Sequence, residues 1–251
     1  GESQVIHCAI GVTRSVKEGK EQIREMLVEG AVDRAFEELR ADKQRTGERI
    51  RVRTSDEAFD RWVNTWMKHQ LEFVRHWGRV IGRGFRDILQ DTFGHRLVDP
   101  EGARKCILEV CSKQYPDGRG IRAWHLPNAE LDLQDYADSP SWLIMALSFY
   151  LKETGDFGIL EETVSFLNAE DPYAESTASA TVWEHVLRAQ RHLVSDRGEH
   201  GLSRIHYGDW CDTMNGVGPA GRGESVMLSM QVKWGCDQLA ELAGQFGRAE
   251  I

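Results

Sequence analysis

Apolar residues return every three or four positions along most of this chain, which is the spacing of amphipathic helices. After Ser55 the pattern predicts about seven helices and no convincing strand. The clearest predicted helices cover 15–42, 55–77, 100–115, 140–154, 157–167, 176–194 and 224–246. Ser15 with Glu18 fits a capping box for the first of them, and Ser55 or Asp56 is expected to cap the second. The helix around Trp142 is apolar on most sides, so we expect it inside a double ring of helices, as in a helical toroid or solenoid.

The first residues follow another pattern. Residues 4–12 alternate partly and are rich in β-branched side chains, which predicts one strand. A lone strand needs a partner sheet, which we expect upstream in a longer protein. The sequence thus divides into a strand segment (1–14), a helical linker (15–54) and a helical domain (55–251).

A polar, glycine-rich segment interrupts the helices at 208–225. Asp209 and Asp212 flank Trp210, and this density of Asp, Asn and Gly favours a loop. Such loops often carry carboxylate chemistry, and the flat face of a Trp suits a sugar ring. The alternative is a surface turn with an anchoring Trp.

Composition narrows the function. A net charge of -9 argues against a general nucleic-acid surface, because binding of phosphate groups needs clustered Lys and Arg. Five cysteines without a CxxC pair indicate a reducing compartment and no zinc site. No stretch approaches the ~18 apolar residues of a membrane span, and no signal peptide is visible. We therefore expect a cytoplasmic protein that does not act on a membrane.

Several motifs, in order, carry a resemblance to a known family. They are Asn64-x-Trp66-x-x-x-Gln70, then Gly84-Phe85-Arg86-Asp87-x-x-Gln90-Asp91, Thr154-Gly155-Asp156, Gly208-Asp209-Trp210-Cys211-Asp212 and Gly221-x-Gly223-Glu224-Ser225-Val226. Together they resemble glycoside hydrolase family 94, the inverting glycoside phosphorylases. The resemblance implies a mainly α fold, a partial (α/α)6 barrel preceded by a linker helix and the last strand of an N-terminal β-sandwich.

Four departures from the family pattern leave the glycosidic linkage and the acceptor open. Cys211 stands where the family often has Asn, Met227 replaces a Trp, Ala137-Asp138-Ser139 replaces its Ser-Asp-Asp segment, and Arg122-Ala123-Trp124-His125-Leu126-Pro127 replaces its Trp-rich loop.

The implied reaction needs one catalytic carboxylate. An acid protonates the leaving oxygen while inorganic phosphate, already an anion, attacks the opposite face of the sugar. The resemblance assigns the acid to Asp212, with phosphate as co-substrate and no cofactor or metal. Asp209 is the rival acid, and we interpret it as orienting the loop.

Further candidates would bind substrate. Arg75 and Asp91 are predicted to hold hydroxyls of the donor glucosyl unit, with a structural Arg–Asp pair as the alternative. Arg86 would serve phosphate or a sugar hydroxyl, or equally pair with Asp87. The weaker candidates are Gln90 for the sugar, Trp210 for the sugar subsite, and Trp124 and His125 for the acceptor subsite.

The leading prediction is therefore a phosphorylase that converts a β-linked glucoside and phosphate to α-glucose 1-phosphate, as a homodimer. Three alternatives stay open: a phosphorylase-like segment of a cyclic β-1,2-glucan synthase, an inverting (α/α)6 glycoside hydrolase, and an inert carbohydrate-binding fragment.

Overall fold

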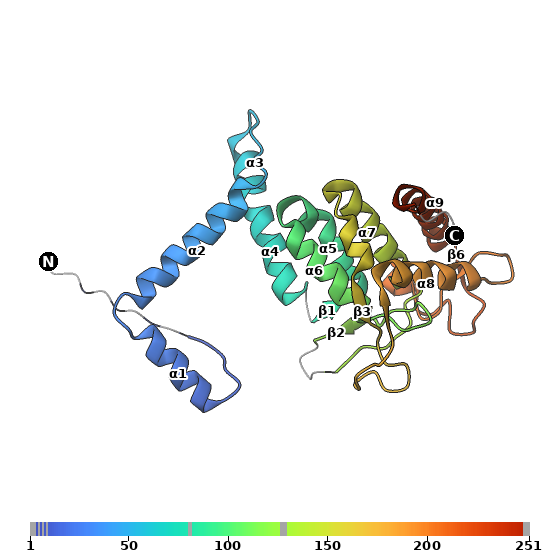
Figure 1. Ribbon diagram of the computed structural model, residues 1–251, viewed down its shortest axis with the longest axis horizontal. Coiled ribbons are helices and arrows are strands. Elements are labelled where there is room, and N and C mark those ends of the chain that lie inside the picture. Colours follow the sequence, from blue (N-terminus) through green and yellow to red (C-terminus); the bar gives the residue numbers. More distant parts are fainter. Residues whose placement is uncertain are drawn as a thin grey trace. The chain divides into compact units, whose positions relative to one another are not determined.

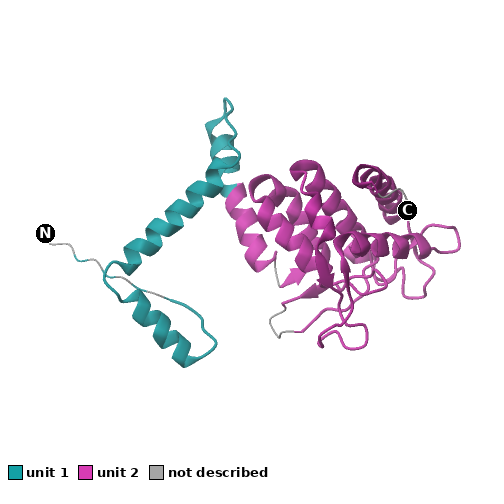
Figure 2. Ribbon diagram, viewed as in Figure 1, with its two compact units in different colours: residues 1–66 teal, residues 67–251 magenta. Residues whose placement is uncertain are grey.

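The computed structural model describes Gln4, Ile6, Cys8 and residues 10–79, 82–125 and 130–247. The chain forms two compact units, residues 1–66 and residues 67–251 (Figure 2). The domain boundaries expected from the sequence stay predictions.

The first unit begins with α1 (Val16–Met26) and α2 (Ala31–Glu48). The Ser15 side chain accepts the Glu18 N–H at 3.2 Å, so the predicted cap of α1 is confirmed. The single helix predicted over 15–42 is two helices, because the chain turns at Gly30, whose φ of +72° favours glycine. No residue of either helix is buried within its unit.

The predicted strand over 4–12 lies partly outside the described residues, which omit 5, 7 and 9. The described residues of this stretch belong to no strand. Asp56 caps α3 (Glu57–Arg61) by accepting the N–H groups of Ala58 and Phe59, as expected. A π-helical segment η1 (Trp62–Met67) and α4 (Lys68–Trp77) then continue the chain.

The second unit holds the hydrophobic core. Its main helices are α5 (Phe85–Val98), α6 (Pro100–Cys111), α7 (Ser139–Thr154), α8 (Val182–Ser195) and α9 (Val226–Phe246) (Figure 1). Helix α7 packs against the other four. Its Leu143, Ile144 and Leu147 are fully buried, which explains why this helix is apolar on most sides.

Short strands join the helices, and the sequence did not predict them. In the part of the chain that the structure describes, three antiparallel two-stranded ribbons pair β1 (Arg83–Gly84) with β2 (Ala123–Trp124), β3 (Thr163–Ser165) with β4 (Ser179–Thr181), and β5 (Ser203–Arg204) with β6 (Glu224–Ser225). The helix predicted over 157–167 is also wrong, because only the short 3-10 helix η2 (Phe157–Glu161) forms before β3.

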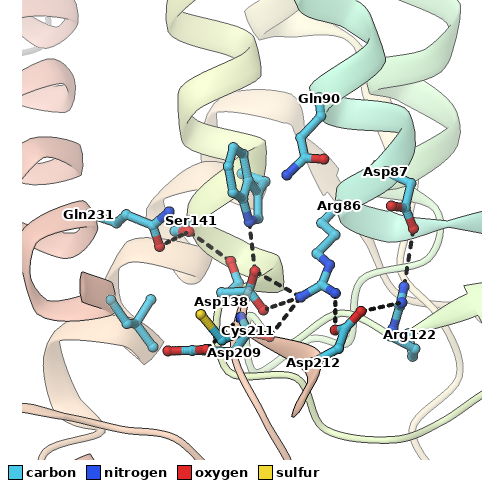
Figure 3. A network of polar contacts seen from close by, with 12 residues as sticks. Arg86, Asp87, Gln90, Arg122, Asp138, Ser141, Asp209, Cys211, Asp212 and Gln231 are labelled. Carbon is cyan, nitrogen blue, oxygen red and sulfur yellow. Dashed lines mark hydrogen bonds and ion pairs between the residues drawn. The ribbon is translucent and has the colours of Figure 1, made fainter. Parts of the chain in front are cut away.

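The fold is mainly α, as expected. The ribbons tie loops to helix starts: β1 leads directly into α5, and β6 leads into α9. These two junctions bring the motifs around Arg86 and Asp212 to the same side of the helical core (Figure 3).

Candidate active site

The loop before α9 is fixed by Asp209. This buried carboxylate accepts the Ser225 hydroxyl at 2.6 Å and the Cys211 N–H at 2.8 Å. Ser225 in turn caps α9 by accepting the Leu228 N–H. Both carboxylate oxygens of Asp209 therefore accept hydrogen bonds that fix the loop, as expected of a residue that orients the loop.

Asp212 lies at the start of the short 3-10 helix η3 (Asp212–Met214) and has an exposed carboxylate, with 55% of its side chain accessible. Arg86 Nη2 donates to one of its oxygens, and Arg122 Nη2 lies 3.9 Å from the other. The carboxylate is thus open to solvent yet flanked by two guanidinium groups (Figure 3).

Arg86 itself is buried, with 5% of its side chain accessible. Its Nη1 donates to the Asp209 carbonyl at 2.8 Å and to both oxygens of Asp138 at 3.3 Å. Burial lowers the pKa of Arg86, but the charges of Asp138 and Asp212 outweigh burial and raise the pKa above its usual range. The predicted alternative pairing of Arg86 with Asp87 is not what the structure shows.

Asp138 is the partner that sequence reasoning missed. Its carboxylate is fully buried and accepts the Trp142 indole N–H at 2.7 Å. Burial raises the pKa of Asp138, and Arg86 and Trp142 oppose that rise. The signal was present in Ala137-Asp138-Ser139, a segment that we interpreted only as a departure from the family.

The aromatic ring of Tyr136 contacts both arginines. The guanidinium carbons of Arg86 and Arg122 lie 5.0 and 4.8 Å from the centre of the Tyr136 ring. Such cation–π contacts hold a flat guanidinium against a ring face. Tyr136 thus links the two arginines that flank Asp212.

The second half of the site is built on Arg79. Its guanidinium donates to Asp91 at 2.7 Å, to Asp87 at 3.3 Å and to the Gln90 side-chain oxygen at 3.0 Å. Burial raises the pKa of Asp91, and the hydrogen bond and charge of Arg79 oppose that rise. Asp87 also accepts from Arg122 at 3.1 Å, so it connects the two halves.

The result is one continuous chain of alternating charges, which we call the charge chain. Its members in order are Asp91, Arg79, Asp87, Arg122, Asp212, Arg86 and Asp138. It connects the predicted acid Asp212 to the predicted sugar ligand Asp91.

A cavity of about 380 Å³ lies along the charge chain. Its charged lining consists of Arg79, Asp87, Asp91, Arg122, Asp132 and Asp212. Asp132 was not predicted. Carboxylates outnumber guanidinium groups here, so the lining offers acceptors and donors suited to a neutral, hydroxyl-rich ligand.

The remaining predicted residues lie apart from this cavity. Arg75 and His125 line a second cavity of about 280 Å³, together with Arg83 and Lys105. Arg75 pairs with Glu72 at 2.6 Å and lies 3.6 Å from Asp99. The predicted partnership of Arg75 with Asp91 is therefore absent from the structure, and Arg79 occupies that place.

The two predicted tryptophans differ. Trp124 has only 1% of its surface accessible and donates to Glu109 at 2.9 Å, so it belongs to the core and presents no open face to an acceptor sugar. Trp210 is half exposed, at 51%. It is not part of the lining of the cavity that holds Asp212.

Among the described residues, no group of three or more His, Cys, Asp or Glu side chains is placed to hold a metal ion. No helix in the described part of the chain has the length and apolar character needed to cross a membrane.

Comparison with known proteins gives evidence on the family of this chain that does not depend on the geometry of the site. Residues 44–250 match the model of the glycosyl hydrolase 94 superfamily, catalytic domain. A solabiose phosphorylase of Paenibacillus borealis is 37% identical over 100% of this chain and 31% of that protein. A 3-O-beta-D-glucopyranosyl-beta-D-glucuronide phosphorylase of the same organism is 31% identical over 100% of this chain and 32% of its own length.

A cyclic beta-(1,2)-glucan synthase of Rhizobium meliloti is also similar, 32% identical over 83% of this chain and 8% of the synthase. The chain spans about a third of the length of the two phosphorylases.

Proposed function

The chain belongs to the glycosyl hydrolase 94 superfamily, and on that basis we propose that it is part of an inverting glycoside phosphorylase. The reaction would convert a β-linked glucoside and inorganic phosphate to α-glucose 1-phosphate and a free sugar. The observation that carries the proposal is the open carboxylate of Asp212 beside a cavity lined for a neutral sugar.

In this mechanism Asp212, in its protonated form, donates its proton to the glycosidic oxygen. A phosphate oxygen forms the new bond to the anomeric carbon from the opposite face as the glycosidic bond breaks. Asp212 is left as a carboxylate, which the adjacent Arg86 and Arg122 stabilise. The same groups would serve the reverse reaction.

We propose that Asp91 and Arg79 hold hydroxyls of the donor sugar, with Arg79 in the role expected of Arg75. Both line the cavity with Asp212, and Gln90 positions the Arg79 guanidinium. Phosphate ligands, the acceptor subsite, a homodimer and a cytoplasmic location stay predictions.

The test uses the full-length protein and a panel of β-linked glucosyl disaccharides. Release of α-glucose 1-phosphate, followed by phosphorus NMR, should require phosphate and disappear in the variant Asp212→Asn, with kcat lower by at least about 10³-fold. Retention of phosphorolysis by this variant would remove Asp212 from the role of acid.

The similarity to a glucan synthase supports a second candidate, a phosphorylase-like segment of a larger synthase. Phosphate dependence separates the candidates. Glucose release without phosphate would indicate a hydrolase, and chain-length changes in a longer β-1,2-glucan would indicate action within a synthase.

A further inference from the structure

Asp138 stands at a helix start but does not act as a cap. It is the N-cap residue of α7, where an Asp side chain ordinarily accepts a backbone N–H of the first turn. Here its side chain makes no capping hydrogen bond. The carboxylate is turned instead toward Arg86 and Trp142.

A buried carboxylate without partners would destabilise the fold, because it has lost its hydration. Removal of the Arg86 guanidinium would leave the charge of Asp138 uncompensated. Trp142 and the Arg86 guanidinium replace the lost water. A capping residue would have been satisfied by the helix without either of them.

The contacts of Arg86 fix the orientation of its guanidinium group. One terminal nitrogen, Nη1, is taken by Asp138 and by the Asp209 carbonyl, and the ring of Tyr136 lies against the guanidinium plane. With one edge and one face fixed, the other nitrogen, Nη2, points at the Asp212 carboxylate (Figure 3). Among the described residues, Asp212 has no other close side-chain donor, since Arg122 lies at 3.9 Å.

We propose that Asp138 is a positioning residue: through Arg86, it holds the side chain of Asp212 in the orientation from which the proton is delivered. This inference rests on the proposed function. Asp138 does not touch the cavity and is not a catalytic residue. Its effect reaches Asp212 only through the guanidinium between them.

The first experiment introduces Asp138→Asn into the full-length enzyme. Asn keeps the shape but loses the charge that fixes Nη1, so Arg86 swings and Asp212 loses its orientation. We expect kcat for phosphorolysis to fall about 10- to 100-fold, with KM for both substrates within about threefold. Ser141→Ala is the matched control, since it removes a hydroxyl bonded to the Asp138 carbonyl and Gln231 but spares the carboxylate.

A double variant separates positioning from general damage. If Asp138 acts through Arg86, adding Asp138→Asn to Arg86→Ala should cause almost no further loss of kcat. If the two residues act independently, the fold-losses of kcat of the two single variants should multiply. If Asp138→Asn does not fold, Arg86→Lys keeps a charge for Asp138 but cannot bridge two carboxylates from separate nitrogens. Its kcat should fall at least about tenfold by the same argument.

The crystal structure of the full-length Asp138→Asn protein gives a readout independent of activity. Loss of the contact between Arg86 and Asp212 supports the inference, and an unchanged contact overturns it. An unchanged kcat in Asp138→Asn or Arg86→Lys also overturns it while leaving the proposed function intact. Absence of phosphorolysis in the unmodified enzyme would instead defeat the proposed function, and the crystal structure would still decide the contact.

Discussion

The two ends of the charge chain are built differently. At one end, Arg86 and Asp138 are both buried, with 5% and 0% of their side chains accessible. At the other end, Arg79 pairs with Asp87 and Asp91 while 40% of its own side chain faces solvent. Breaking a buried ion pair costs about 3–5 kcal/mol, whereas breaking an exposed pair costs about 1 kcal/mol or less.

This difference suggests a division of labour around Asp212. In the proposed mechanism, the buried end would fix the position of Asp212, and the exposed end would exchange its carboxylate contacts for contacts with the hydroxyl groups of a sugar. Three substitutions and one pH titration test whether the two ends differ in this way.

The largest effect is expected at the buried end. Arg86→Ala leaves Asp138 buried without its charged partner, which should lower the free energy of unfolding by about 3–5 kcal/mol. Chemical denaturation of the full-length protein measures this. A loss below about 1 kcal/mol would mean that the two ends do not differ.

A pH titration distinguishes the charge chain from the core next to it. Burial, helped by the charge of Arg75, lowers the pKa of His95 to about 4. Between pH 6.5 and 4 the unfolded state then binds more protons than the folded state, so stability is lost as pH falls through that window, by about 2 kcal/mol at pH 5.

The Asp138 and Asp91 carboxyls have the opposite effect on the pH dependence of stability. Burial raises the pKa of both carboxyls, so each stabilises the folded state in acid and loses that contribution as pH rises. The variant His95→Gln should therefore flatten the loss between pH 6.5 and 5 in thermal unfolding curves. An equal loss in the variant would trace the acid sensitivity to another group.

The junction between the two ends can be disturbed with one methyl group. A Cβ on Gly84 would overlap the Asp87 carboxylate and lie 3.1 Å from Nη1 of Arg122. Gly84→Ala should displace this pair, lower kcat/KM about tenfold or more and cost about 1–3 kcal/mol of stability. Gly244→Ala in α9 is the control, since an added Cβ there meets nothing within 4 Å.

The smallest stability effect is expected at the exposed end. Arg79→Ala should change the free energy of unfolding by less than about 1 kcal/mol, because 40% of the Arg79 side chain is accessible to solvent. In steady-state kinetics its main effect should be a higher KM for the glucoside. A large drop in stability with unchanged KM would assign Arg79 a structural role.

Local sequence signals predicted much of the helical fold. The caps at Ser15 and Asp56 and the apolar helix around Trp142 follow from neighbouring residues, and the structure has them. The β1–β2 and β5–β6 ribbons were missed because strands of two residues have no periodicity to detect.

The site was predictable only in part. Asp212 and Asp91, two residues of the family motifs, line one cavity, and their roles as acid and sugar ligand stay predictions. Arg75 was predicted and Arg79 was not considered, because sequence spacing alone does not tell which arginine near the end of α4 turns toward α5. Asp138 was missed because its role depends on burial and on a contact with Arg86, far away in the sequence.

The ring of Tyr136 carries one more consequence. Because the Tyr136 ring contacts the guanidinium groups of both Arg86 and Arg122, a mutation at that position removes a cation–π contact from two cations at the same time. A substitution there is therefore expected to disturb both guanidinium groups beside Asp212 together.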